Sequence, residues 1–196
     1  NLLIDNFDHE GYWSPVAKYQ KKAYWYVVKS PNTAVTFPTT REIDTMYVNI
    51  LDALISSDGA YKGNSLHLEY LPVDNNVTDF LIPGVRLGFN GIGFSNIDTI
   101  SFMAKGNDQI TVRLHGEEPW NMPQATYKVT LDSTWKLYKI ATSDMFIKDS
   151  HYPSWQGVKS RLHWVTFPVE LKGSSIWIDE VKFNNATIND LLFYKY

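Results

Sequence analysis

Apolar and polar residues alternate with a period of two along most of this sequence, and clusters rich in Gly, Asn, Asp and Pro separate the alternating stretches. Successive side chains of a β-strand point to opposite faces, so this pattern is typical of half-buried strands joined by turns. We expect eight strands, which cover residues 24–29, 65–71, 99–105, 110–116, 127–131, 135–142, 163–169 and 175–183.

Residues 41–56 are the exception to this alternation, because their larger apolar residues recur at the spacing of a helix face. One short helix is therefore expected there. Strands of this length without alternating helices favour an all-β fold, a two-sheet antiparallel β-sandwich of the jelly-roll type. The 196 residues fit one domain of ordinary size, which we expect to span residues 1–196.

The alternation also assigns side chains to faces. In residues 110–115 the three apolar side chains share the core face, so Arg113 and His115 point together to the other side. In residues 164–169 the same rule turns Trp164 away from the core. A surface that contains a guanidinium, an imidazole and an outward tryptophan is a candidate ligand site.

Aromatic residues are unusually frequent: 7 Trp, 12 Tyr and 10 Phe make up 15% of the chain, more than one core of this size easily absorbs. We expect some rings at the surface, including Trp120, Tyr152 and Trp155 in turn-rich stretches. A sugar offers an apolar C–H face and a rim of hydroxyls, so flat aromatic surface beside polar groups suits it. For any single Trp, packing within the sandwich is the more common role.

Charge and composition exclude several classes of partner. The formal net charge of -3 lacks the basic footprint of a nucleic-acid binder. No apolar run approaches the roughly 18 residues needed to cross a bilayer, so no membrane partner is expected. The first residues lack the features of a signal peptide, and we expect a mature fragment. The absence of cysteine excludes a disulfide scaffold and a thiolate zinc site.

Five motifs follow one another in the chain: LIDNFD at residues 3–8, NSLHLEY at 64–70, IDTISF at 97–102, YKVTLDSTWK at 127–136 and IWIDEV at 176–181. Their order and spacing resemble carbohydrate-binding modules of the galactose-binding-like jelly-roll type, closest to family 11 and its relatives. Each motif alone encodes only a strand and a turn. The resemblance lies in their succession along most of the chain.

This resemblance implies a non-catalytic module that lays a plant cell-wall polysaccharide, a β-glucan or hemicellulose, across a concave sheet lined by aromatic residues. Tyr127 resembles a family tyrosine that faces this cleft, and the strand of Arg113 and His115 belongs to the same sheet. The full set of candidate sugar-contacting residues is Trp25, Arg113, His115, Trp120, Tyr127, Tyr152, Trp155 and Trp164. The resemblance further implies a secreted, extracellular protein of bacterial type, monomeric, whose module targets an attached enzyme within a larger multidomain chain.

The resemblance also implies structural Ca²⁺ near the first and last strands. Calcium takes six to eight oxygen ligands, and Asp5, Asp8 and Asp179 are the candidates. An alternative stays open, in which Asp5 and Asp8 are turn residues and Asp179 caps a strand end.

Two other functions remain as alternatives. A jelly-roll glycoside hydrolase needs two carboxylates that flank the bond, but the pairs Glu117–Glu118 and Asp179–Glu180 are consecutive and would face opposite sides of a strand. The sequence contains no HExxH and no G-x-S-x-G motif. A protein-interaction or assembly domain would use the same aromatic residues as interface anchors, and an assembly-factor family of respiratory complex I shares this architecture.

Overall fold

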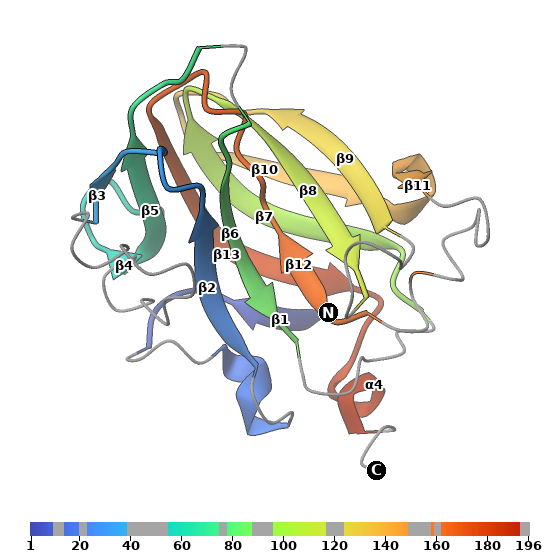
Figure 1. The fold of residues 1–196 in the computed structure, drawn as a ribbon. Helices are drawn as coiled ribbons and strands as arrows, with labels where there is room; N and C mark the ends of the chain where they lie inside the picture. Colours follow the sequence, from blue (N-terminus) through green and yellow to red (C-terminus); the bar gives the residue numbers. More distant parts are fainter. Residues whose placement is uncertain are drawn as a thin grey trace.

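Two antiparallel sheets lie face to face in the computed structural model of the chain (Figure 1). The structure describes residues 1–9, 14–19, 23–38, 55–74, 78–87, 96–116, 124–148, 158 and 162–192. The predicted all-β fold, a two-sheet antiparallel sandwich of jelly-roll type, is confirmed.

The seven-stranded sheet has the strand order β10-β7-β13-β5-β3, with β1 paired to β13 and β4 paired to β5. Its strands are β1 (Leu2–Asp5), β3 (Val35–Phe37), β4 (Ile55–Ser56), β5 (Ser65–Tyr70), β7 (Thr99–Gly106), β10 (Lys136–Ala141) and β13 (Ser175–Asn184).

The six-stranded sheet has the order β11-β9-β8-β12-β6-β2. Its strands are β2 (Tyr24–Lys29), β6 (Leu81–Arg86), β8 (Gln109–His115), β9 (Gln124–Thr130), β11 (Phe146–Lys148) and β12 (Trp164–Thr166). Short helices follow β1, β10 and β13: η1 (Pro15–Lys18), η2 (Thr142–Asp144) and α4 (Ile188–Leu192). No helix in the described ranges is both long and apolar enough to cross a membrane.

All eight strands expected from the alternation are present, and all but two of their ends lie within one residue of the expected position. β9 begins three residues earlier than expected, and β12 (Trp164–Thr166) ends three residues earlier than expected. The strands that the alternation did not reveal are β1, β3, β4, β6 and β11. Four of these have only two to four residues, too few for a period to show, and β6 contains Pro83 and Gly84.

The expected helix at residues 41–56 is wrong at its end, where Ile55 and Ser56 form β4 and pair with Leu66 and Ser65 of β5. A two-residue strand is stabilised by its neighbour rather than by its own sequence, which explains why periodicity missed it. The other positions of the expected helix, residues 41–54, lie outside the described residues.

Aromatic rings from both sheets meet in the core. Phe102 of β7 packs edge-on against Phe167, with ring centroids 5.5 Å apart, and Phe167 stacks on Trp25 of β2 at 6.3 Å. All three side chains are fully buried. The predicted core face of residues 110–115 is also confirmed, since its three apolar side chains have no exposed surface.

Candidate functional site

Cross-strand pairing gathers one group of side chains on the outer face of the six-stranded sheet. Trp164 in the centre pairs with His115 of β8 and with Arg86 of β6. One step along the strand, Thr166 pairs with Arg113 and Gly84. Directly paired residues point to the same face of a sheet. We call the following residues the β12 face: Tyr24, Tyr26, Gly84, Arg86, Arg113, His115, Trp164 and Thr166.

The half-buried indole of Trp164 is the centre of this face. The Tyr26 ring meets it edge-on at a centroid distance of 5.0 Å, and the His115 ring lies nearly parallel to it at 6.3 Å. The guanidinium carbon of Arg86 lies 5.2 Å from the indole centroid, within cation–π range. Three side chains therefore hold the orientation of the indole.

Gly84 gives Tyr26 its place on the sheet. A Cβ atom at position 84 would lie 2.9 Å from the Tyr26 hydroxyl oxygen and 2.8 Å from Cγ2 of Thr166. The phenol ring therefore lies across the surface that a larger residue would occupy. Burial lowers the pKa of the Arg113 guanidinium. The nearby oxygen of Tyr26 has a smaller, opposite effect, and the net result is a lowered pKa.

Two buried polar atoms of the β12 face have no hydrogen-bond partner in the described structure. They are Nε of Arg113 and Oγ1 of Thr166, which belong to residues paired across β8 and β12. Buried polar groups in proteins are nearly always hydrogen-bonded, and an orphaned donor costs about 1–3 kcal/mol. Because these atoms have almost no exposed surface, an ordered water can bridge them to a polar ligand on the face.

His115 is a neutral acceptor on this face at neutral pH. Its Nδ1 lies 3.1 Å from the carbonyl oxygen of Gly116, and a carbonyl can only accept, so Nδ1 carries the proton and Nε2 is the acceptor nitrogen of the ring. Burial and, as a smaller effect, the charge of Arg113 lower the pKa of His115 to about 4. The imidazole is therefore available to accept a hydrogen bond from a hydroxyl group.

This lowered pKa predicts a loss of stability in acid. The folded-state pKa of about 4 lies below the value of 6.5 for a free imidazole, so the unfolded chain takes up the proton first. The contribution of the neutral His115 to the free energy of unfolding is complete above pH 6.5. It is lost as the pH falls toward 4, by up to about 3 kcal/mol. Urea unfolding of the wild type and of His115→Gln at several pH values measures this loss. The wild type should lose more stability than His115→Gln between pH 6.5 and 4. Parallel curves would contradict the prediction.

Two candidates from the sequence need correction. The side chain of Trp25 has no exposed surface, and its indole nitrogen donates to Oδ2 of Asp5 at 2.7 Å, so Trp25 is a core residue and cannot stack on a ligand. Tyr127 pairs with Val112, whose side chain points into the core. Tyr127 is 40% exposed at the edge of the sandwich, but it does not share the face of Arg113 and His115.

Of the other six candidate sugar-contacting residues, three lie where the alternation predicted them and three lie outside the described residues. Arg113, His115 and Trp164 come together on one face, as the alternation predicted. Trp120, Tyr152 and Trp155 lie outside the described residues. The sequence reasoning missed four members of the β12 face, Tyr24, Tyr26, Gly84 and Arg86. In β2 the two tyrosines have the parity opposite to Trp25 and Val27, but the apolar Val28 shares their parity, so the alternation alone did not mark them as outward.

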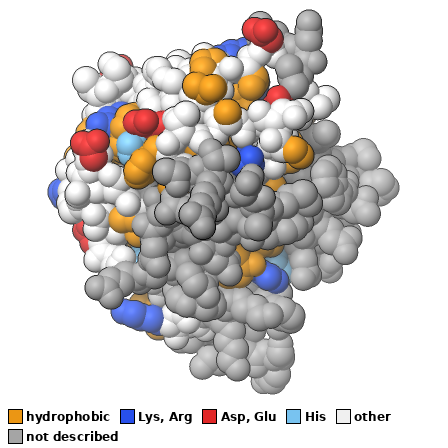
Figure 2. Space-filling model, turned by 60° about the vertical axis from the view of Figure 1, so that its left-hand side comes forward, with side chains coloured by type: hydrophobic (Ala, Val, Ile, Leu, Met, Phe, Trp, Pro, Cys, Tyr) orange, Lys and Arg blue, Asp and Glu red, His pale blue; other side chains and the backbone are white. Residues whose placement is uncertain are grey.

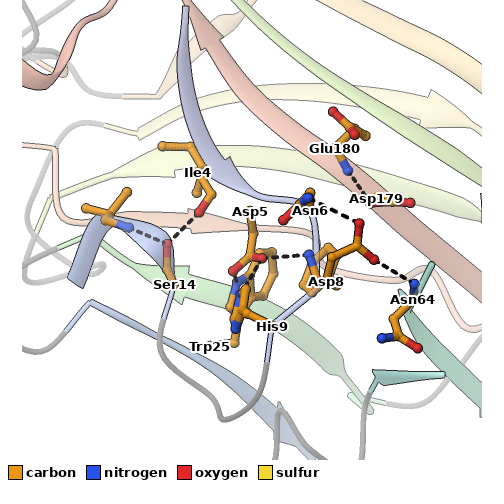
Figure 3. Close-up of polar contacts among 12 residues, drawn as sticks. Ile4, Asp5, Asn6, Asp8, His9, Ser14, Trp25, Asn64, Asp179 and Glu180 are labelled. Atoms are coloured by element: carbon orange, nitrogen blue, oxygen red, sulfur yellow. Dashed lines mark hydrogen bonds and ion pairs between the residues drawn. The ribbon is translucent and has the colours of Figure 1, made fainter. Parts of the chain in front are cut away.

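The carboxylate of Asp5 does not fit a cation site. Oδ1 receives the backbone N–H of Phe7 at 2.8 Å and contacts Nε2 of His9 at 2.8 Å, while Oδ2 receives the indole of Trp25 (Figure 3). Hydrogen-bond donors thus occupy both oxygens. Asp5 acts as a buried acceptor that joins β1, the following turn and β2.

Asp8 and Asp179 differ from Asp5. Asp8 is exposed and accepts the backbone N–H of Asn64 at 2.9 Å, and Asp179 is buried and accepts the backbone N–H of Glu180 (Figure 3). Asp179 also accepts a hydrogen bond from the hydroxyl of Ser65. Burial raises the pKa of Asp179 to about 7. A bound cation would suit that carboxylate, but no group of three or more His, Asp or Glu side chains within the described ranges is arranged to hold a metal. Calcium binding stays a prediction.

The architecture is that of the β-sandwich carbohydrate-binding modules. The family 11 carbohydrate-binding module of the cellulosomal cellulase Lic26A-Cel5E of Clostridium thermocellum superposes with a TM-score of 0.62 at 15% identity, over 94% of each chain. A family 11 module of Clostridium thermocellum in complex with a β-1,3-1,4-mixed-linked tetrasaccharide has a TM-score of 0.57 at 16% identity, over 83% of this chain and 89% of the other.

A third solved structure, the family 30 module of the cellulosomal cellulase Cel9D-Cel44B of Clostridium thermocellum, has a TM-score of 0.50 at 16% identity and covers 67% of this chain and 82% of its own. No family model and no curated protein matches the sequence. At these identities the comparisons establish the fold, and they confirm the jelly-roll resemblance that the five motifs indicated.

Proposed function

We propose that this chain is a non-catalytic carbohydrate-binding module that binds a β-glucan or hemicellulose chain across the β12 face. The observation that carries the proposal is the oriented indole of Trp164 next to two buried polar atoms without partners, Arg113 Nε and Thr166 Oγ1. The indole would stack on the C–H face of a sugar ring. The two buried polar atoms would bind its hydroxyls through ordered water, and the acceptor nitrogen of His115 would accept a hydrogen bond.

The chemistry of the face supports binding rather than hydrolysis. Its eight residues are aromatic, cationic or neutral, and none is a carboxylate. Glycoside hydrolysis uses two carboxyl groups on either side of the scissile bond. The solved structure that holds a mixed-linked β-1,3-1,4 tetrasaccharide has the same fold, which supports β-glucan as the first ligand to test.

The wider role that we propose is to target an attached enzyme to the plant cell wall. A polysaccharide of that kind is met outside the cell, so we propose a secreted, extracellular protein. Within a multidomain chain, the module would act as a monomer, and Ca²⁺ would stabilise its fold near Asp8 and Asp179.

Replacing Trp164 by alanine tests the binding surface. Loss of the stacking ring is expected to weaken binding of mixed-linkage β-glucan by about tenfold to a hundredfold, which corresponds to roughly 1.4–2.8 kcal/mol. Isothermal titration calorimetry against soluble mixed-linkage glucan, xyloglucan, xylan and glucomannan gives the affinities. Thermal unfolding of each variant shows whether the fold is kept.

Tyr127→Ala is the matched control, because Tyr127 is an exposed aromatic residue on the opposite face of the same sheet. It should leave the affinity unchanged. An equal loss in both variants would contradict the β12 face as the binding surface. Release of reducing sugar by the wild type would make the protein a hydrolase, and absence of binding to every glycan would favour a protein-interaction domain.

A further inference from the structure

A second group of aromatic and basic residues lies on the outer face of the other, seven-stranded sheet. Trp177 of β13 pairs with His67 of β5 on one side and with Lys105 of β7 on the other. Trp135 immediately precedes β10 and lies beside Lys105, whose ammonium nitrogen is 5.4 Å from the indole centroid. These side chains therefore form a row across the strands.

One end of this row is closed by stacking. The imidazole of His67 lies between the ring of Phe37, at a centroid distance of 4.5 Å, and that of Trp177, at 4.2 Å. The side chain of His67 is buried. Figure 2, turned so that the side of the molecule with β3, β4 and β5 comes forward, shows hydrophobic, basic and acidic side chains next to one another on this side. A ligand would therefore meet the other end of the row.

A single turn fixes both indoles at that other end. The indole nitrogen of Trp177 donates to the carbonyl of Asp58 at 3.2 Å, and that of Trp135 donates to the carbonyl of Gly59 at 3.0 Å. Gly59 has a positive φ of 63°, and a Cβ there would lie 2.8 Å from Nζ of Lys105. Because the N–H groups are already used, the rings offer a ligand only carbon surface, in an orientation set before binding.

Tyr61 extends this surface toward solvent. Its ring is 39% exposed and contacts Trp135 at a centroid distance of 5.7 Å. The ammonium nitrogen of Lys62 lies 5.3 Å from the Tyr61 ring, and that of Lys105 lies 4.5 Å from the Trp177 ring. Among the described residues neither lysine forms an ion pair with a carboxylate. Within the described part of the chain, two ammonium groups thus lie beside aromatic rings without an ion pair to a carboxylate.

We propose that this surface, the Trp135 face, is a second and separate glycan-binding site for a polysaccharide that bears carboxylates, such as one containing uronic acids. The Trp135 face consists of Tyr61, Lys62, Lys105, Trp135 and Trp177. The rings of Tyr61 and Trp135 stack on the sugar C–H face, and the two ammonium groups pair with the sugar carboxylate. The site lies on the opposite sheet from the β12 face, so both sites can be occupied at once.

Calorimetric titration with polygalacturonate and with glucuronoxylan tests the proposal, with mixed-linkage β-glucan as the neutral comparison. The wild type should bind the carboxylated glycans, and the affinity should fall as salt is added, because partly exposed charges are screened. Trp135→Ala and Tyr61→Ala should each weaken this binding by about tenfold or more. The double variant Lys62→Gln with Lys105→Met keeps much of the side-chain packing, and it should lose both affinity and salt dependence.

Trp164→Ala is the matched control on the opposite sheet, and it should bind carboxylated glycans like the wild type. Failure of the wild type to bind either carboxylated glycan at low salt would overturn the proposal. So would unchanged binding in Tyr61→Ala and in the double lysine variant, neither of which removes a core side chain. The neutral β-glucan separates the two proposals. Loss of β-glucan binding in Trp164→Ala tests the β12 face alone. Loss of carboxylated-glycan binding in Tyr61→Ala tests the Trp135 face alone.

Discussion

Replacing Asp5 by alanine is expected to lower the free energy of unfolding by about 2–6 kcal/mol, because each of two buried donors that lose their acceptor costs about 1–3 kcal/mol. The carboxylate has no exposed surface and accepts the indole N–H of Trp25 at 2.7 Å and the backbone N–H of Phe7 at 2.8 Å. Alanine would leave these buried donors without an acceptor. Urea unfolding at neutral pH measures the loss.

The backbone conformation at Phe7 adds to the effect. Phe7 has a positive φ of 56°, which is uncommon for a residue with a side chain, and its buried ring packs against Trp25 at a centroid distance of 4.9 Å. The bond from Phe7 N–H to Asp5 holds this turn in place. Loss of the carboxylate therefore loosens both the turn and the ring contact.

Two controls sharpen this measurement. Asp8→Ala removes a nearby but exposed carboxylate, so its cost should stay within about 1 kcal/mol. Asp5→Asn keeps an acceptor oxygen and should cost less than Asp5→Ala. The loss in Asp5→Ala should be equal with added Ca²⁺ and with a chelator, because donors already occupy the carboxylate. A loss seen only with calcium present would make Asp5 a metal ligand and contradict the structure.

Replacing Gly84 by alanine is expected to weaken glycan binding by about tenfold or more, with a smaller loss of stability of about 1–2 kcal/mol. The new methyl group would lie 2.9 Å from the Tyr26 hydroxyl and 2.8 Å from Thr166 Cγ2, too close for either contact. Both neighbours are side chains that can move, so the sheet survives. Their movement changes the part of the β12 face that orients the indole of Trp164. Calorimetry and thermal unfolding give the two quantities.

A double variant shows whether the predicted contact is the cause. Thr166→Ser removes the Cγ2 methyl group and so makes room on one side of position 84. The stability cost of Gly84→Ala should then be smaller in the Thr166→Ser background than in the wild type. Simple addition of the two single costs would show that the methyl groups do not meet.

The period-two pattern was enough to predict most of the sheet and half of the candidate site. Most strands of six or more residues repeat the alternation often enough to reveal their position and their buried face. The exception is β6, which contains Pro83 and Gly84. That is why Arg113, His115 and Trp164 could be assigned to an outward surface before any pairing was known. Short strands such as β4 are too short to show this repeat, and they form because they pair with a longer neighbouring strand.

Trp25 and Tyr127 show where local pattern stops being informative. In β2 the residues on both sides of Trp25 are also aromatic, so hydrophobicity alone does not distinguish its two faces. The acceptor that draws the indole inward, Asp5, is 20 residues away in the chain. Tyr127 was assigned from a motif, but the face of a strand residue depends on register, and a shift of one residue reverses it. The pairing with Val112 places Tyr127 on the side opposite Arg113.

The sequence by itself therefore determined the fold class, the position of the longer strands and the outward direction of Arg113, His115 and Trp164, because these follow from contacts between neighbours in the chain. Only the tertiary structure decided which outward side chains meet. Tyr26 reaches Trp164, and Trp135 reaches Tyr61, through strand order and register. These properties arise from packing between segments that are far apart in sequence, which no local period records.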